Sequence, residues 1–205
     1  KISNAEKLNE DEIALITLAM WASEPIPFDP MEIALHEAYG KFVHPDERPR
    51  YEMIHEYPLS GRPPMMTHVF RNESGHRIVA AKGAPEALMQ VSVLSADEKE
   101  SLNDAFFTLA EKGFRVLCVG VSSFAGENFP SSQQELKFVI KGLVAFYDPP
   151  KENIREVFEA FYTAGIAVKI ITGDNAATTS TIARQINFRG AEKTMSGEEL
   201  LNMSE

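Results

Sequence analysis

The spacing of apolar and polar residues predicts two helices at the start of the chain. Apolar residues follow Asn9 at intervals of three and four, which is typical of one helical face. Asn9 and Glu12 stand ahead of this run, three residues apart, as in a capping box. A second helix is predicted from Asp29, because Asp caps well, Pro30 suits the first helical position and Glu32 can reach back to the cap amide.

The middle of the chain has the patterns of strands separated by short turns. Strands are predicted in residues 51–57, 66–82, 114–121 and 136–146, and residues 71–76 form a hairpin turn within the second run. Helices are expected from Pro85 and from Ser95, the latter ending before Gly113. Residues 122–134 are rich in Ser and Gly and predict a loop. This part therefore predicts an antiparallel sheet flanked by helices.

After Asp148 the pattern changes to alternating helix and strand. A helix is predicted from Lys151 to Ala164, then a buried strand at residues 166–171, then a helix starting near Asn175. Such an alternation favours a parallel sheet. We therefore expect an α/β (α+β) protein of two domains, residues 1–147 and 148–205.

Composition narrows the class of protein. The chain is 44% hydrophobic and 24% charged, with a net charge of -10, and a diffuse acidic balance disfavours nucleic-acid binding. Its single cysteine, Cys118, lies in an apolar run, so a disulfide framework is excluded and a core position is expected. No stretch reaches the roughly 18–20 apolar residues needed to cross a bilayer, and the first residues do not resemble a signal peptide. A soluble chain is expected, although its parent need not be soluble.

Residues 172–174 are one candidate phosphate site. They follow the predicted buried strand and open a helix, where backbone amides favour phosphate. Thr172 can donate its hydroxyl, and Gly173 lets the backbone come close. The alternative is an ordinary strand–helix turn in which Asp174 or Asn175 caps the helix.

Lys82 and Arg115 are further candidates. Lys82 ends a predicted strand, where its ammonium could meet a nucleotide, and Arg115 near a strand start suits phosphate. A solvated edge lysine and an ordinary surface arginine are the alternatives, and capping alone can explain Glu32. The five histidines lack the spacing of metal ligands, so we expect them to be structural or surface residues and expect no metal site; they are His36, His44, His55, His68 and His76.

Five short motifs, taken together, resemble those of one family. In the order and approximate spacing found in P-type cation-transporting ATPases, the chain carries Asp29–Glu32, Lys82–Glu86, Gly113–Leu117, Asp148–Pro150 and Thr172–Asp174. The calcium-pump-like branch is the most similar. The resemblance implies a nucleotide-binding domain up to residue 147, followed by part of a haloacid-dehalogenase-like phosphorylation domain.

The resemblance also implies the roles of particular residues. The ATP site would be lined by Glu32, Lys82, Gly83 and Arg115. Thr172 would contact the transferred phosphoryl group, with Gly173 and Asp174 beside it. Asp148 would help to position the nucleotide and couple the domains, and Lys151 stands where the family usually has arginine, which keeps the charge but loses the planar fork.

The adenine pocket departs from the family pattern. Leu59 and Pro64 stand where the family usually has a stacking Phe and a Lys. On a regular strand Tyr57 shares the face of Leu59, and nearby prolines could bend it over the base, where stacking stabilises binding by about 1–3 kcal/mol. The alternative is that Tyr57 packs in the sheet and Leu59 alone forms a looser pocket.

The resemblance finally implies a membrane-embedded parent that uses ATP and Mg²⁺, with this chain on the cytoplasmic face. Its partners would be ATP and the pump's remaining domains and membrane helices. The Asp-Lys-Thr-Gly-Thr segment with the phosphorylated aspartate is absent and would lie before Lys1, and the later magnesium-holding segment is absent too. No catalytic residue is therefore expected in this chain, which should bind ATP without turning it over.

Two other functions compete with this interpretation. A freestanding phosphatase of the dehalogenase-like class would need an Asp-x-Asp or Asp-Lys-Thr-Gly nucleophile segment, and the sequence has neither. A non-catalytic interaction domain with a decayed nucleotide pocket is supported only by Leu59 and Pro64. An ATP titration separates it from the first interpretation. The transported cation does not follow from this sequence.

Overall fold

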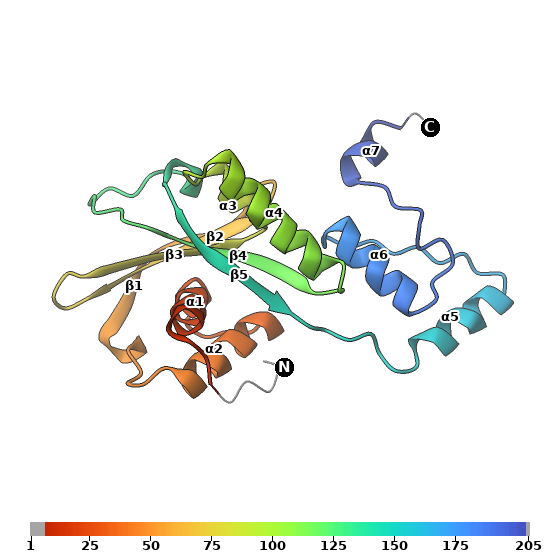
Figure 1. Cartoon of the computed structure of the whole chain (residues 1–205), viewed down its shortest axis with the longest axis horizontal. Helices are drawn as coiled ribbons and strands as arrows, with labels where there is room; N and C mark the ends of the chain where they lie inside the picture. Colours follow the sequence, from red (N-terminus) through yellow and green to blue (C-terminus); the bar gives the residue numbers. More distant parts are fainter. Residues whose placement is uncertain (1–6, 204–205) are drawn as a thin grey trace. The chain divides into compact units, whose positions relative to one another are not determined.

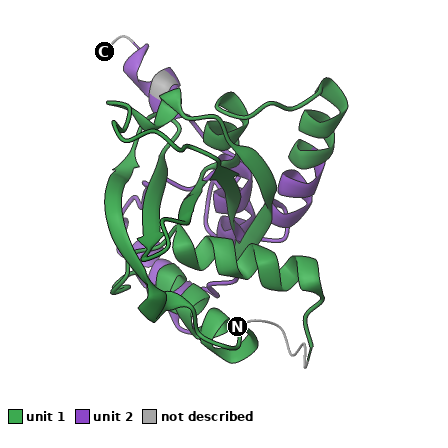
Figure 2. Cartoon of the chain, turned by 90° about the vertical axis from the view of Figure 1, so that its left-hand side faces the viewer, with its two compact units in different colours: residues 1–103, 116–146 green, residues 104–115, 147–205 purple. Residues whose placement is uncertain are grey.

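A computed structural model describes residues 7–203. They form two compact units (Figure 2), which are described separately below. The first contains the chain up to Asn103 together with Val116–Phe146, and the second contains Asp104–Arg115 together with the chain from Tyr147 onward.

The first unit is built on a five-stranded sheet with strand order β1-β2-β3-β4-β5 (Figure 1). The strands are β1 (Tyr51–Ser60), β2 (Met65–Asn72), β3 (Arg77–Gly83), β4 (Arg115–Ser122) and β5 (Val139–Phe146). The first four pair with their neighbours in antiparallel fashion. This confirms the antiparallel sheet and the hairpin between β2 and β3.

Two pairs of helices cover the two faces of this sheet (Figure 1). The helices are α1 (Glu10–Trp21), α2 (Pro30–Phe42), α3 (Pro85–Gln90) and α4 (Ala96–Ala110). Successive side chains of a strand point to opposite faces. Accordingly, Ala80 of β3 packs with Met20 of α1 and Tyr39 of α2, whereas Ala81 packs with Leu88 of α3.

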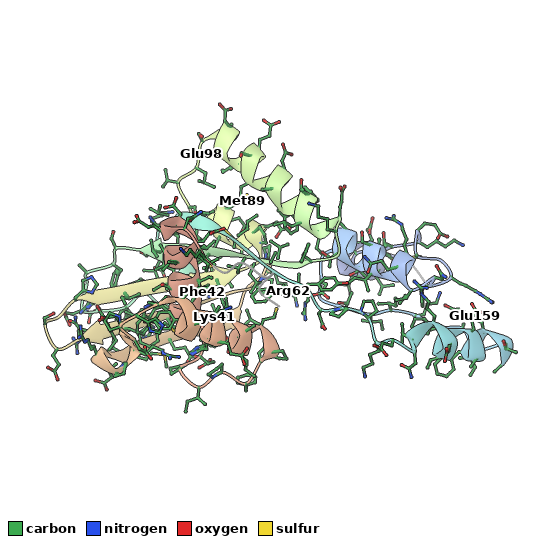
Figure 3. All side chains as sticks on the ribbon, turned by 60° about the horizontal axis from the view of Figure 1, so that its bottom comes forward. Lys41, Phe42, Arg62, Met89, Glu98 and Glu159 are labelled. Atoms are coloured by element: carbon green, nitrogen blue, oxygen red, sulfur yellow. The ribbon has the colours of Figure 1, made fainter. Side chains whose placement is uncertain are left out.

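The helix starts predicted at Asn9 and at Ser95 are confirmed by capping hydrogen bonds. The Asn9 side chain accepts from the Glu12 amide at 2.8 Å, and Glu12 accepts from the Asn9 amide at 2.9 Å, which closes a capping box. Glu98, near the start of α4 (Figure 3), accepts from the Ser95 amide at 2.8 Å. Two 3-10 turns, η1 (Arg48–Arg50) and η2 (Gln133–Glu135), complete the first unit.

The second unit contains the end of α4 from Asp104, together with α5 (Ile154–Thr163), α6 (Ala176–Gln185) and α7 (Gly197–Leu201). Phe158 and Tyr162 of α5 form aromatic contacts with Phe188, which follows α6. Glu159 of α5 (Figure 3) pairs with Arg189 at 3.0 Å. The helices predicted at 151–164 and near Asn175 are therefore present, with the first starting three residues later than expected.

The predicted buried strand at residues 166–171 is wrong. The segment has no strand assignment, and Ile166, Ile170 and Ile171 are 49%, 41% and 96% exposed. A strand is stabilised by hydrogen bonds to a neighbouring strand. Among the described residues no strand pairs with this segment, so its β-branched residues belong to no sheet. The parallel sheet expected for residues 148–205 is thus not seen.

Within residues 7–203, no helix is long and apolar enough to cross a membrane.

Candidate functional site

A buried ion pair lies at the end of β3 in the first unit. The Lys82 ammonium donates to Glu32 Oε1 at 2.5 Å and to the Ser23 hydroxyl at 2.7 Å. Lys82 and Glu32 are only 5% and 6% exposed. The alternative of a solvated edge lysine is therefore wrong, since Lys82 is held inside the protein by two defined partners.

The sequence brings these side chains together through strand alternation and a helix cap. Lys82 lies opposite Met66 in the β2–β3 register and shares the face of Ala80, which is covered by α1 and α2. The Asp29 side chain caps α2 by accepting from the Met31 amide at 2.8 Å. Glu32 then falls in the first helical turn.

Glu32 does not bind the backbone amide of the cap residue Asp29, as the capping interpretation predicts. Its carboxylate accepts from Lys82 and, at 3.4 Å, from the Glu24 amide, and α2 has no capping box. A buried ammonium attracts a carboxylate more strongly than a backbone amide does. The capping explanation of Glu32 is therefore wrong, whereas the cap by Asp29 is confirmed.

The pair retains unused hydrogen-bonding capacity. Burial lowers the pKa of Lys82, and the hydrogen bond that Lys82 donates to Glu32 opposes this shift. Glu32 Oε2 is buried and has no hydrogen-bond partner. An ammonium has three N–H groups, of which two are used by the described partners. One acceptor and one donor thus remain at adjacent side chains.

The same polar network continues to a histidine that the sequence analysis did not select. His68 is completely buried in β2, and its Nδ1 lies 2.9 Å from the Ser23 carbonyl oxygen. Burial lowers its pKa, while the Ser23 carbonyl opposes this. Its Nε2 has no hydrogen-bond partner and faces the carboxylates of Glu24 and Glu56. The strand pattern contained one signal for His68, because His68 and Lys82 lie on the same face of the paired strands β2 and β3.

Gly83 has a packing role in this structure. A Cβ at this position would lie 2.6 Å from both the Met65 Cα and the Pro64 carbonyl oxygen. The Ala84 amide donates to that same carbonyl at 3.0 Å. The end of β3 therefore passes so close to the start of β2 that only glycine fits, which fixes the position of Lys82 beside it.

Tyr57 lies away from the Lys82 pair. It belongs to the apolar cluster that includes Val79 and Ala81, on the opposite face of the sheet from Lys82, and its hydroxyl donates to the Pro130 carbonyl at 2.7 Å. The expected alternation is interrupted by a register shift between Tyr57 and Ser60. Leu59, within this shift, is 65% exposed. The structure thus agrees with the alternative in which Tyr57 packs in the sheet.

Residues 172–174 form a hydrogen-bonded loop in the second unit. Arg115 Nε donates to Asp174 Oδ1 at 3.1 Å, and the Asp174 amide donates to the Thr172 hydroxyl at 3.0 Å. Asn175 caps α6 by accepting from the Ala177 amide at 2.8 Å. Arg115 therefore contacts this loop through Asp174. The cap of α6 is Asn175 and not Asp174.

The other predicted residues of the second unit are open to solvent. A Cβ at Gly173 would meet no atom within 4 Å, so packing does not require glycine there. Asp148 and Lys151 are exposed in the segment between β5 and α5. Their predicted contacts with nucleotide are not tested by these positions and stay predictions.

Sequence comparison assigns the helix-flanked sheet to a known class of domain. The family model described as "P-type ATPase, cytoplasmic domain N" matches residues 27–153, more than half of the chain. The chain therefore belongs to the P-type ATPase family, which confirms the resemblance found in its motifs.

Three curated relatives illustrate the breadth of this family. The chain is 30% identical over 191 residues to a calcium-transporting ATPase of Bacillus subtilis, covering 86% of the chain and 22% of that protein. It is 29% identical to the sodium/potassium exporting P-type ATPase cta3 of Schizosaccharomyces pombe, covering 78% of the chain and 17% of that protein. It is 27% identical to magnesium-transporting ATPase, P-type 1, of Escherichia coli K12, covering 76% and 19%. The chain thus spans about a fifth of the length of these relatives.

Proposed function

We propose that this chain is the ATP-binding part of a P-type ATPase that couples ATP hydrolysis to cation transport across a membrane. The observation that carries the proposal is the buried Lys82–Glu32 pair with an unpartnered carboxylate oxygen, within the segment that matches the family's cytoplasmic domain N. The transport step and the aspartyl-phosphate intermediate would belong to the whole pump.

The unused groups of the pair match one edge of adenine. Adenine carries an amino donor next to a ring-nitrogen acceptor, and guanine presents two acceptors at the same edge. If the surrounding side chains open to admit the base, Glu32 Oε2, which is buried in this structure, can accept from the amino group, and the third N–H of Lys82 can donate to the ring nitrogen. Guanine would place an oxygen against a carboxylate instead. The pair therefore favours ATP over GTP.

The remaining contacts are assigned by family resemblance and by position. Gly83 holds the β3 end in place, and exposed Leu59 would offer apolar contact to the base in place of an aromatic ring. We keep Tyr57 out of this pocket because it packs on the other face of the sheet.

Arg115 and the loop of Thr172, Gly173 and Asp174 would serve the phosphates. In the structure Asp174 neutralises Arg115, so phosphate would compete with this carboxylate for the guanidinium. The exposed Asp148 and Lys151 would act at the junction with the phosphorylation domain. These roles rest on the resemblance.

Magnesium would enter with the ATP phosphates. Asp174 is engaged with Arg115, and among the described residues of the second unit no cluster of three metal-ligating side chains is found. We therefore assign no magnesium ligand to this chain. Because the sequence also lacks an Asp-Lys-Thr-Gly segment, the chain should bind ATP without hydrolysing it.

Calorimetric titration of the chain with ATP and with GTP tests the proposal. We expect ATP to bind about tenfold or more tightly than GTP, since guanine leaves buried polar groups unpaired. The double variant Lys82→Met/Glu32→Gln should lose most ATP affinity. Both residues are changed because removing Lys82 alone would leave Glu32 as a buried unpaired charge.

Lys41→Met is the matched control, because Lys41 is exposed in the last turn of α2 (Figure 3), whereas Glu32 is buried in the first turn of the same helix. It should bind ATP as the wild-type chain does. Equal ATP affinity in the wild type and in the folded double variant, checked by circular dichroism, would contradict the proposed site. Failure of the wild type to bind ATP would favour an interaction domain with a decayed pocket.

A further inference from the structure

Three side chains from separate elements converge beside the Lys82 pair. Glu24 lies between α1 and α2, Glu56 lies on β1, and His68 lies opposite Glu56 on β2. One ligand atom from each lies within 4.8 Å of the other two. Both glutamates are partly buried, and His68 is completely buried.

The histidine ring is fixed in the orientation of a metal ligand. A carbonyl oxygen can only accept, so His68 Nδ1, at 2.9 Å from the Ser23 carbonyl, must carry a proton. The lone pair of the neutral ring then lies on Nε2, which points to the two carboxylates. Metal-binding histidines commonly donate their other N–H to a backbone carbonyl in this way.

The spacing fits an ion between the groups better than direct contact. His68 Nε2 lies 3.9 Å from Glu24 Oε1, which is beyond hydrogen-bonding distance. Two metal–ligand bonds of about 2.0–2.2 Å at a tetrahedral angle place their ligand atoms roughly 3.3–3.6 Å apart, a little closer than this separation. All three ligand atoms lie within 4.8 Å of one another, so the partly buried carboxylates would need to move inward by no more than about 1.5 Å to reach tetrahedral spacing.

The charges also favour a divalent cation. Glu24 and Glu56 face the imidazole of His68, and Lys82, a cation whose charge acts on His68, is already paired with Glu32. Imidazole together with carboxylates suits zinc and similar transition metals, whereas magnesium and calcium prefer oxygen ligands alone.

We propose that Glu24, Glu56 and His68 form a binding site for a divalent transition-metal ion of the Zn²⁺ class. This site does not depend on the proposed ATP function. Ser23 joins the two regions, because its carbonyl accepts from His68 and its hydroxyl accepts from Lys82.

Calorimetric titration with ZnCl₂, in excess Mg²⁺ and without nucleotide, tests the site in the 205-residue chain. We expect one Zn²⁺ to bind per chain, and expect Glu24→Gln and Glu56→Gln each to weaken the affinity at least about tenfold. These variants keep side-chain size at partly buried positions, so they should fold even where a change of buried His68 does not.

Matched controls exclude adventitious surface binding. Glu52→Gln changes an exposed glutamate on the same strand as Glu56, and His76→Gln changes an exposed histidine. Both should keep wild-type Zn²⁺ affinity. Nitrogen-15 NMR should show the His68 Nε2 resonance moving on Zn²⁺ addition while Nδ1 keeps its proton. The proposal is overturned if the wild type binds no stoichiometric Zn²⁺, or if Glu24→Gln and Glu56→Gln bind it as tightly as the wild type.

Discussion

At the scale of single residues, the glycines at positions 83 and 173 differ in how closely other atoms surround them. Both belong to motifs with proposed nucleotide contacts. Gly83 is buried where β3 passes the start of β2, and a Cβ there would lie 2.6 Å from backbone atoms of Pro64 and Met65. Gly173 is exposed, with open space around its Cα. Only the first is therefore required by the fold.

Gly83→Ala should destabilise the chain, because backbone atoms cannot move aside as a flexible side chain can. We expect a loss of about 1–3 kcal/mol in the free energy of unfolding, measured by urea denaturation. Gly173→Ala is the control and should change stability by no more than about 0.5 kcal/mol. A Gly83→Ala chain as stable as the wild type would show that β2 and β3 are not packed this closely.

Residue roles were only partly predictable from the sequence. The motifs selected Glu32 and Lys82 separately, and the cap explanation of Glu32 was the simpler one until the structure paired the two. Ser23, Glu24 and Glu56 belong to no motif. Only folding brings Ser23 to Lys82 and brings Glu24 and Glu56 to His68. Their contacts depend on strand register and on how α1 and α2 cover the sheet, which residue spacing alone does not specify.

At the scale of elements, the helix starts were well predicted because their signals are local. The cap by Asn9 and the cap by Asp29 each involve residues within three positions, so the sequence contains all the partners. The strand at 166–171 was predicted from apolar β-branched residues alone. Its failure has a physical reason, since a strand also needs a neighbour, and no local pattern reports one.

The side-chain amide of buried Gln133 connects the 3-10 turn η2 to β2. Gln133 accepts from the Thr67 hydroxyl at 2.8 Å and donates to the Met65 carbonyl at 2.8 Å, so it ties η2 to β2. Gln133→Leu would leave both groups buried without a partner. We expect the free energy of unfolding to fall by about 2 kcal/mol or more.

Gln134→Leu changes the exposed neighbouring residue of the same turn and serves as the control. Thermal unfolding should show it within about 0.5 kcal/mol of the wild type. A similar loss of stability in both variants would mean that stability depends on the turn as a whole and not on the buried side-chain amide of Gln133.

At the scale of the whole molecule, the comparisons show the family of the chain, and the named members of that family transport different ions. The relatives named above are calcium, sodium/potassium and magnesium transporters, at 30%, 29% and 27% identity. These values are too close to favour one ion. The chain spans about a fifth of each relative, so the shared segment reflects what these pumps have in common. The central claim is therefore about ATP.

The most direct test of that claim is an amide NMR titration of the chain with ATP. The account predicts that resonances of Glu24, Glu32, Lys82 and Gly83 shift together and saturate at one ATP per chain, because Glu24 and Lys82 bind the Glu32 carboxylate and Gly83 follows Lys82 in the chain. Resonances of the apolar cluster on the opposite face, such as Leu88, should remain in place. Saturable shifts centred elsewhere, with the Lys82 region unchanged, would contradict the account.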